Sequence, residues 1–275
     1  MKKYVNLFVF VFMVGACFSQ GKAQTKSAVS YKNPVVDIAM PDPTVIKAAD
    51  GYFYMYATES TRNVPIMKSK DLVQWTYCNT AFTNKTRPRF EPKAGIWAPD
   101  INYINNKYVL YYAMSVWGGE QTCGIGVATA DSPQGPFTDH GKMFRSNEIG
   151  VQNSIDPSFL QYEGRNYLVW GSFRGIYVIE LTEDGLSLKP GAEKKRIAGT
   201  AFEAAYIHKH GDYYYMFASI GSCCEGIRST YKVVVGRSKK VWGPYKDKSG
   251  KPMLKNGYSL VIGANDHFVG NGHGS

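Results

Sequence analysis

Four acidic residues recur along this 275-residue chain, and each heads a short apolar run. They are Asp42 in "DPTVI", Asp100 in "DINYI", Asp156 in "DPSFL" and Glu203 in "EAAYI", and each stands four residues before an Ile or Leu. Carboxylates that are buried close together repel one another and lose solvation, so their pKa values spread apart. That spread lets one carboxyl group donate a proton while another accepts one. The four acids are therefore candidates for general acid–base chemistry, although any one of them alone is an ordinary strand-end residue.

Each acidic run is followed by a turn and a strand dense in aromatic residues. These second strands are "DGYFYMYAT" (50–58), "NNKYVLYYAMS" (105–115), "EGRNYLVWGSF" (163–173) and "HGDYYYMFASI" (210–220). Gly and Asn at the turns are typical of β-hairpins, and the Tyr, Val and Phe content suits a half-buried strand. The acids are 58, 56 and 47 residues apart, so the hairpin is part of an internal repeat.

Further strand-like segments close each repeat, at residues 64–76, 124–141, 175–188 and 231–250. Each unit therefore comprises about four antiparallel strands, which is the size of a propeller blade. No helical period of useful length interrupts them. The sequence predicts an all-β propeller in which the first strand of each blade lines the axis. All four acids, sharing one register, would then ring one end of the central channel.

Composition limits the classes of protein to consider. Aromatic residues make up 14% of the chain and charged residues 20%, which favours a β-rich globular protein. The formal net charge is +10, but there is no nucleic-acid-binding motif, and the basic residues are interpreted as solvated strand faces. No apolar run is long enough for a transmembrane helix. We expect a monomer that binds a polysaccharide and no nucleic acid.

The first 23 residues are typical of a secretory signal peptide. Two lysines precede the apolar stretch "LFVFVFMVGACF", and a short polar segment with small residues follows it. Cleavage near Ala23 would give a secreted or periplasmic protein of net charge +7, because residues 1–23 hold three lysines and no acid. The alternative is a lipid anchor on Cys17, since "VGAC" loosely resembles a lipobox.

Four cysteines follow the leader: Cys78, Cys123, Cys223 and Cys224. None forms a CxxC pair, so their spacing does not indicate a zinc site. Export permits disulfides, but the sequence does not define their pairing. A bridge between the adjacent Cys223 and Cys224 would close a strained ring and is not predicted.

The repeated motifs resemble those of glycoside hydrolase family 43 from about residue 33 onward. The similar segments are "DPTVI" with "GYFYMYAT", "WAPDINYINNKYVLYYAMS", "NSIDPSFL" with "YLVWGSF", and "FEAAYIHKHGDYYYMF". The run that begins "CCEGIRSTYKVVVGRSKK" is similar to the endo-arabinanase branch, which cuts α-1,5-linked arabinan internally. The resemblance implies a five-bladed β-propeller and an inverting hydrolysis of arabinose- or xylose-containing polysaccharides.

The resemblance also assigns roles to three of the four acids. Asp42 would be the general base that activates water, and Glu203 the general acid that protonates the leaving oxygen. Asp156 would lie beside Glu203, orient it and raise its pKa. Inversion needs room for a water between base and sugar, which corresponds to carboxyl groups roughly 6.5–9.5 Å apart. Asp100 matches a position outside this trio and is interpreted as structural.

Sugar rings and hydroxyl groups need aromatic and polar partners near the acids. The candidates are Trp97, Trp117, Asn153, Ser172 and Phe173. Each has an equally ordinary interpretation as a packing or turn residue. Ser115 occupies the matching strand end in the second unit and is a weaker candidate.

One metal ligand is predicted. The ending "GNGHGS" is similar to a family segment whose histidine lies beside a metal ion on the propeller axis, which points to His273. A single histidine completed by water suggests a hard ion such as Ca²⁺.

The last segment, "GYSLVIGANDHFVGNGHGS", is expected to be only the innermost start of a fifth blade, so the catalytic domain, residues 24–275, would be incomplete at its C-terminus. The leading hypothesis is a secreted arabinan endo-1,5-α-L-arabinosidase. The alternatives are an α-L-arabinofuranosidase or β-xylosidase of the same fold, and a non-catalytic carbohydrate-binding propeller, which would not need the acidic trio.

Overall fold

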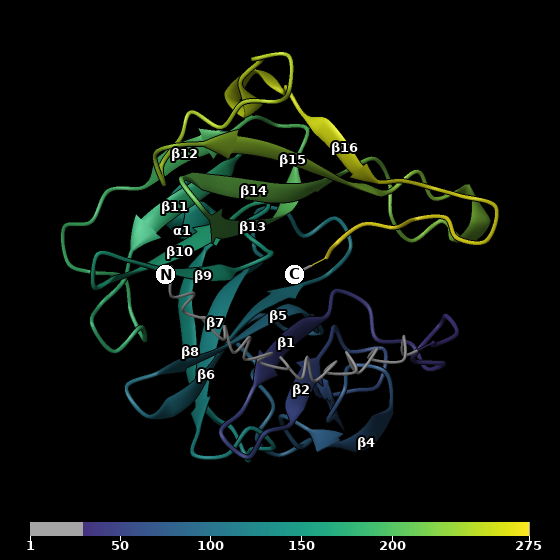
Figure 1. Cartoon of the computed structure of the whole chain (residues 1–275). Coiled ribbons are helices and arrows are strands. Elements are labelled where there is room, and N and C mark those ends of the chain that lie inside the picture. The colour runs from purple at the N-terminus through teal and green to yellow at the C-terminus, as the bar shows by residue number, and fades with distance from the viewer. Residues whose placement is uncertain (1–29, 275) are drawn as a thin grey trace, which may run out of the picture. The chain divides into compact units, whose positions relative to one another are not determined.

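The computed structural model of the protein describes residues 30–274 (Figure 1). The proposed leader, its cleavage site and Cys17 lie outside the described residues. From Asn33 onward the chain forms one unit, in which the strands make four antiparallel sheets of four strands each. The expected all-β propeller architecture is confirmed, and four blades are present in the described part of the chain.

The first two sheets follow one another in the chain, each with its strands in sequential order. The first sheet comprises β1 (Thr44–Lys47), β2 (Phe53–Tyr56), β3 (Pro65–Ser69) and β4 (Trp75–Thr80). The second comprises β5 (Gly95–Ile104), β6 (Lys107–Ser115), β7 (Gly124–Ala130) and β8 (Thr138–Arg145).

The third and fourth sheets repeat this meander. The third comprises β9 (Ser158–Tyr162), β10 (Arg165–Trp170), β11 (Ile176–Glu180) and β12 (Lys195–Ala198). The fourth comprises β13 (Glu203–His210), β14 (Tyr213–Ile220), β15 (Lys232–Ser238) and β16 (Ser259–Ile262). The helical elements among residues 30–274 are one short turn of α-helix and two 3₁₀ turns: α1 (Ser146–Ile149), η1 (Gly226–Arg228) and η2 (Met253–Lys255).

The first strand of each sheet lines a common channel. Strand β1 contacts β5, β5 contacts β9, and β9 contacts β13. Residues from all four strands line one cavity of about 310 Å³, which runs between them. A second, smaller cavity is lined by Pro43 and Pro157, which lie just before β1 and β9, and by Pro99 and Ala205, which lie in the first halves of β5 and β13. The four inner strands therefore begin at the same end of the channel.

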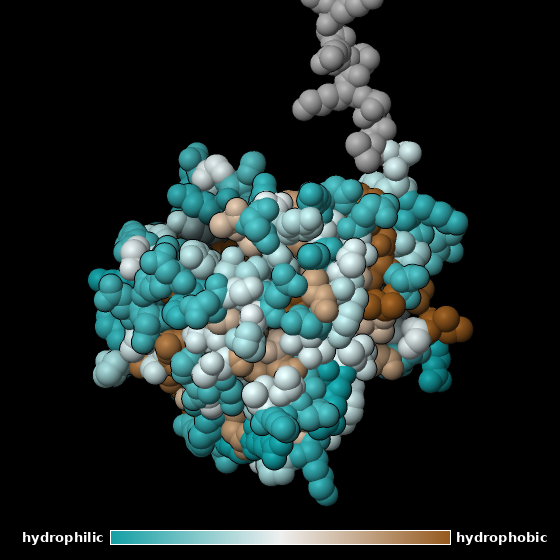
Figure 2. All heavy atoms as spheres, turned by 90° about the horizontal axis from the view of Figure 1, so that it is seen from below, coloured by the Kyte–Doolittle hydropathy of each residue, from teal (hydrophilic) through white to brown (hydrophobic). Residues whose placement is uncertain are grey.

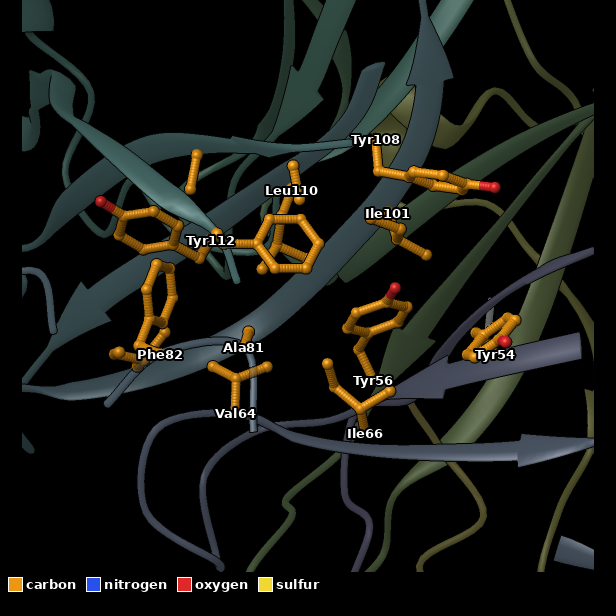
Figure 3. Close-up of a cluster of buried hydrophobic side chains, with 14 of the residues drawn as sticks. Tyr54, Tyr56, Val64, Ile66, Ala81, Phe82, Ile101, Tyr108, Leu110 and Tyr112 are labelled. Atoms are coloured by element: carbon orange, nitrogen blue, oxygen red, sulfur yellow. The ribbon is translucent and has the colours of Figure 1, made fainter. Parts of the chain in front are cut away.

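Neighbouring sheets pack through buried aromatic and aliphatic side chains. Figure 3 shows the cluster between the first two sheets, in which Tyr56 and Ile66 of one sheet approach Leu110 and Tyr112 of the other. All four side chains are fully buried. Removing each such side chain from water contributes about 1.5–3 kcal/mol, so stacking of the sheets is a major source of stability. Similar clusters join the second sheet to the third and the third to the fourth.

Two expectations for the blade boundaries were wrong. The fourth strand of the third sheet, β12, lies beyond the predicted segment 175–188, and the fourth strand of the last sheet, β16, lies beyond 231–250. The segment expected to begin a fifth blade instead supplies β16, which pairs with β15. The cause is local: residues 239–258 make a long excursion that contains η2, so the outer strand comes late in the sequence.

The surface is polar over most of the face seen in Figure 2, where apolar residues form separate small patches. Within residues 30–274, no helix has the length and apolar composition needed to cross a membrane.

Candidate active site

Three of the predicted acids lie at the end of the channel where the inner strands begin, which we call the carboxylate face. Asp42 and Asp156 stand two residues before β1 and β9, and Glu203 is the first residue of β13. Asp156 and Glu203 are buried, at 6% and 8% exposure. The charges of Glu203 and Asp42 both act on Asp156, so the fold brings the three carboxyl groups together from three different sheets.

Asp156 is the most strongly perturbed of the three. Burial raises the pKa of its carboxyl group well above the ordinary value, and the nearby charges of Glu203 and Asp42 raise it further. The backbone N–H of Ala204 donates a hydrogen bond of 3.2 Å to Asp156 Oδ2, which favours the ionised form but does not offset burial. Asp156 therefore tends to keep its proton next to Glu203.

Glu203 is held by a chain of polar side chains. The hydroxyl of Ser172 donates to Glu203 Oε2 at 2.7 Å, and Asn153 Nδ2 donates to Ser172 Oγ at 2.9 Å. Tyr231 is buried nearby, and desolvation together with the charges of Glu203 and Asp156 raises the pKa of its phenol. The phenol therefore stays neutral and can donate a hydrogen bond to Glu203.

Asp42 has a more open environment. Its side chain is 28% exposed, and the hydroxyl of Thr58 donates to Asp42 Oδ2 at 2.6 Å. The hydroxyl of Thr58 is itself fixed by the backbone N–H of Ala98, at 2.7 Å. On the other side, Nδ1 of His273 lies 3.2 Å from Asp42 Oδ1. A positioned carboxylate that is partly open to solvent can accept a proton from a water molecule.

His273 links the first and fourth sheets at this end of the channel. Besides its contact with Asp42, its backbone N–H donates to the Ser219 hydroxyl at 2.7 Å. In Figure 1 the chain returns to the centre of the molecule close to its C-terminal end.

The donors around His273 do not make a cage for Ca²⁺. The ion takes six to eight oxygen ligands, whereas within residues 30–274 no group of three His, Cys, Asp or Glu side chains is arranged so that it could hold a metal ion. A water-completed Ca²⁺ site at His273 stays a prediction, and no catalytic step is derived through it.

Asp100 and Glu203 do not share the register of Asp42 and Asp156, so the expectation of four equivalent carboxylates was wrong. The backbone at Asp42, Ala98, Asp156 and Ala204 has left-handed φ values of 51°, 42°, 57° and 51°. These four positions are the equivalent ones, and the second and fourth sheets place alanine there. A bulge lies at this position in both strands, between Trp97 and Asp100 and between Glu203 and Tyr206; Asp100 stands two residues after it and Glu203 one residue before it.

Asp100 instead points into the channel, two residues beyond Ala98. It accepts hydrogen bonds of 2.7 Å from the backbone of Phe159 and from Asn102 Nδ2. Burial nevertheless raises the pKa of Asp100 to about 6. This environment agrees with the structural interpretation of Asp100.

The two predicted tryptophans lie together. The rings of Trp97 and Trp117 are 5.6 Å apart and tilted by 49°. Trp97 is partly buried and packs against the small cluster of Ala113, Cys123 and Ile155, whereas Trp117 is 78% exposed. Trp97 lies near the start of β5 and Trp117 just past the end of β6, so both belong to the carboxylate face. An exposed indole supported by a second ring is a surface on which a sugar can stack.

The other predicted contact residues make hydrogen bonds within the protein. Asn153 and Ser172 hold Glu203, and Ser172 is only 1% exposed, so its hydroxyl is already committed. Phe173 follows Ser172, with its backbone N–H bonded to Phe202 O at 2.9 Å. Ser115 donates to the neighbouring Val116 carbonyl. Direct contact of these residues with a sugar stays a prediction.

Sequence reasoning missed Thr58, Ser219 and Tyr231. Thr58 and Ser219 stand at the ends of the second strands, the positions that Ser115 and Ser172 occupy in the other two sheets. Aligning the four strand ends, "YAT", "AMS", "WGS" and "FAS", would have identified both. No comparable sequence signal marked Tyr231.

Comparisons with known proteins agree with this geometry. The chain is 38% identical over 245 residues to an extracellular endo-α-(1→5)-L-arabinanase of Bacillus subtilis, covering 84% of this chain and 75% of the relative. It is 35% identical to an extracellular exo-α-(1→5)-L-arabinofuranosidase of Cellvibrio japonicus, covering 85% and 74%. The structure of an α-L-arabinanase from Cellvibrio cellulosa matches with a TM-score of 0.78 at 34% identity, covering 86% of this chain and 82% of the other.

The match extends over the whole unit that carries the three carboxyl groups. The family model for glycosyl hydrolases family 43 covers residues 31–275. The four sheets, the three acids at one end of the channel and these similarities lead to one conclusion: the chain belongs to glycosyl hydrolases family 43 and is a glycoside hydrolase.

Proposed function

We propose that the protein hydrolyses α-1,5-L-arabinofuranosidic bonds within arabinan, with inversion of configuration. The observation that carries this proposal is the meeting of Asp42, Asp156 and Glu203, from three sheets, in three different environments at the carboxylate face. The relatives support the substrate, because one is named an endo-α-(1→5)-L-arabinanase and a related arabinanase structure contains arabinohexaose.

In the proposed reaction Glu203 is the general acid. Hydrolysis of an acetal needs a proton on the leaving oxygen as the bond to the anomeric carbon breaks. Glu203 is buried, and the Ser172 hydroxyl, itself held by Asn153, fixes one of its oxygens. The remaining carboxyl oxygen is then available to direct its proton at the glycosidic oxygen.

Asp42 is the proposed general base. Its two oxygens face Thr58 and His273, and its partial exposure leaves room for a water molecule. Asp42 removes a proton from this water while the oxygen attacks the anomeric carbon from the side opposite the leaving group. That geometry inverts the configuration.

Asp156 is proposed to be a positioning residue. It lies beside Glu203 and has a raised pKa, and it accepts a hydrogen bond from the backbone N–H of Ala204, the residue that follows Glu203. A neutral Asp156 next to an ionised Glu203 can share its proton with it, which prepares Glu203 for the next cycle. Ionised Asp156 would instead favour the protonated form of Glu203 through charge repulsion.

The test is hydrolysis of linear arabinan compared with xylan. We expect the protein to release a ladder of arabino-oligosaccharides from arabinan and to leave xylan largely intact. Release of arabinose alone would identify the exo-acting alternative, which the similarity to an exo-α-(1→5)-L-arabinofuranosidase favours. Cleavage of xylan but not of arabinan would contradict the proposed substrate.

We further propose that a fifth sheet completes the ring of blades. Within residues 30–274, β13 and β1 do not pack together as the other neighbouring inner strands do, and His273 bridges this interval. Leu260, Val261 and Ile262 of β16 are exposed, as expected for a strand whose face meets another sheet. Export through the leader at residues 1–23 is proposed as well, and the extracellular relatives support it.

A further inference from the structure

A pocket of about 350 Å³ lies beside the connection between the first two sheets and is rich in basic residues. Its lining includes Arg62, Arg87, Arg89, Lys93 and one acid, Glu91. Its volume is in the range of small-ligand sites. None of the contacts described above for the three carboxyl groups uses these residues.

The pocket opens on the carboxylate face. Each sheet is an antiparallel meander, so its first and third strands begin at the same edge, and its second and fourth strands end there. Arg62 lies between β2 and β3, and residues 87–93 lie between β4 and β5, so both segments are at that edge. Glu91 also accepts a 3.1 Å hydrogen bond from Thr122, which belongs to the same β6–β7 connection as Trp117.

The acids around the pocket are already neutralised. Arg87 is buried and pairs through both of its terminal nitrogens with Glu59, and it also donates to the Ala94 carbonyl at 2.8 Å. Glu91 pairs with Arg145. These pairs fix the wall of the pocket without contributing net negative charge.

Three of the basic side chains that line the pocket, Arg62, Arg89 and Lys93, form no ion pair with an acid of residues 30–274. Asn84 orients both arginines, because its side-chain oxygen accepts from Arg62 Nε at 3.1 Å and its carbonyl accepts from Arg89 at 3.0 Å. Each arginine keeps further N–H donors, which match a carboxylate in geometry and charge. The pocket therefore carries three uncompensated positive charges.

We infer that this pocket binds the carboxylate of a uronic acid unit carried by the polysaccharide. The inference rests on the proposed function and extends it from neutral arabinan to arabinan attached to acidic sugars. A polymer lying across the carboxylate face passes the Trp97–Trp117 pair and reaches Arg62, Arg89 and Lys93 on the same face. The three cations then add affinity for acid-bearing substrate without altering the bond that is cleaved.

The direct test is calorimetric titration of the protein with a trimer of galacturonic acid, which requires no catalysis. The triple variant Arg62→Ala/Arg89→Ala/Lys93→Ala should weaken binding about tenfold, because each exposed charge pair contributes a small amount. Added salt of about 0.5 M should weaken binding to the parent protein and reduce this difference. The matched control Lys47→Ala/Arg165→Ala/Lys209→Ala removes the same charge at the opposite edge of the sheets and should bind as the parent does.

Three outcomes would overturn the inference. Equal binding by the parent and the pocket variant would show that the pocket takes no uronate. Equal weakening by both triple variants would show that the anion responds only to net charge. Inorganic phosphate and a neutral arabino-trisaccharide serve as comparison ligands, and preference for phosphate over the uronate trimer would also contradict the inference.

A kinetic comparison separates this inference from the proposed function. The pocket variant should keep the parent's kcat and KM on neutral linear arabinan, and should show a raised KM with an unchanged kcat on arabinan that carries uronic acid units. An inactive parent protein on linear arabinan would contradict the proposed function, while the titration would still decide the inference.

Discussion

Glu203 and Asp156 are neighbouring carboxyl groups whose surroundings differ in one decisive respect. The side chain of Glu203 accepts from the Ser172 hydroxyl, whereas Asp156 accepts from one backbone N–H. Burial dominates at Asp156, so its pKa is raised despite that hydrogen bond. The different roles proposed for the two carboxyl groups therefore follow from these local contacts and not from one being Asp and the other Glu.

Replacing Glu203 with Ala should lower the rate of arabinan hydrolysis by about 10²–10⁴-fold, because the leaving oxygen no longer receives a proton. Binding of arabino-oligosaccharides should change little. An aryl arabinoside whose leaving group needs no proton should lose much less activity, which initial-rate measurements would reveal. Equal losses on both substrates would show that Glu203 does not act as the acid.

Replacing Trp117 with Ala tests the exposed indole. Because the side chain is 78% exposed, the free energy of unfolding should stay within about 0.5 kcal/mol of the parent value. The KM for arabinan should rise severalfold if a sugar stacks on this ring, since a stacking contact contributes roughly 1 kcal/mol. An unchanged KM would remove Trp117 from the substrate contacts, and Trp75, an indole on the outer strand β4, offers a control position.

The sequence allowed much of the residue-level site to be predicted. Asp42, Asp156 and Glu203 were identified from their motifs, and the structure brings them together. The hydrogen bond from Ser172 to Glu203 was not predictable, because it joins residues 31 positions apart through the ends of two different hairpins. Tyr231 was missed for the same reason.

At the scale of strands, the alternation of acid, turn and aromatic strand was sufficient to locate each hairpin. The turns at Gly51 and Gly164 adopt left-handed φ values of 84° and 73°, as glycine allows. The register was not predictable, since β5 and β13 each carry a bulge where β1 and β9 have Asp42 and Asp156 just before their starts. Asp100 stands two residues after that position and Glu203 one residue before it. A count of residues to the next Ile or Leu does not detect a bulge.

Replacing Gly171 tests whether the backbone at the strand end beside Glu203 requires glycine. Gly171 has a φ of 126°, and a Cβ atom there would lie 2.2 Å from the Gly175 carbonyl oxygen. Gly171→Ala should lower the free energy of unfolding by about 3 kcal/mol and reduce activity through displacement of Ser172. The control Gly211→Ala has a φ of 56° and open space around it, so it should cost about 1 kcal/mol. Denaturant unfolding of both variants measures the difference, and equal costs would contradict this account.

The whole molecule has a charge on its axis that is poorly solvated. Asp100 lies inside the channel, and its hydrogen bonds to Phe159 and Asn102 do not compensate for burial, so its pKa is about 6. The inner strands β1, β5 and β9 meet around this side chain through Thr44 and Phe159. The stability of the assembled ring should therefore depend on pH.

The sign of that dependence follows from the raised pKa. Between an unfolded value of 3.8 and the folded value of about 6, the folded protein holds a proton that the unfolded chain has released. The contribution of Asp100 to the free energy of unfolding is therefore fully present below pH 3.8. It is lost as the pH rises through 6, and the total loss is about 3 kcal/mol. Asp100→Asn should remove this decline, which unfolding experiments between pH 4 and pH 8 would detect. Parallel pH profiles for the variant and the parent would show that Asp100 ionises as an exposed carboxyl group does.

The left-handed backbone position near the start of each inner strand has a consequence for how such proteins diverge. Asp42 and Asp156 occupy it with a side chain that tolerates this conformation, while Ala98 and Ala204 do not exploit it. Two of the four equivalent positions at this end of the channel therefore carry no reactive side chain. A single codon change at either alanine could install another reactive group there, so new specificities can arise without redesigning the scaffold.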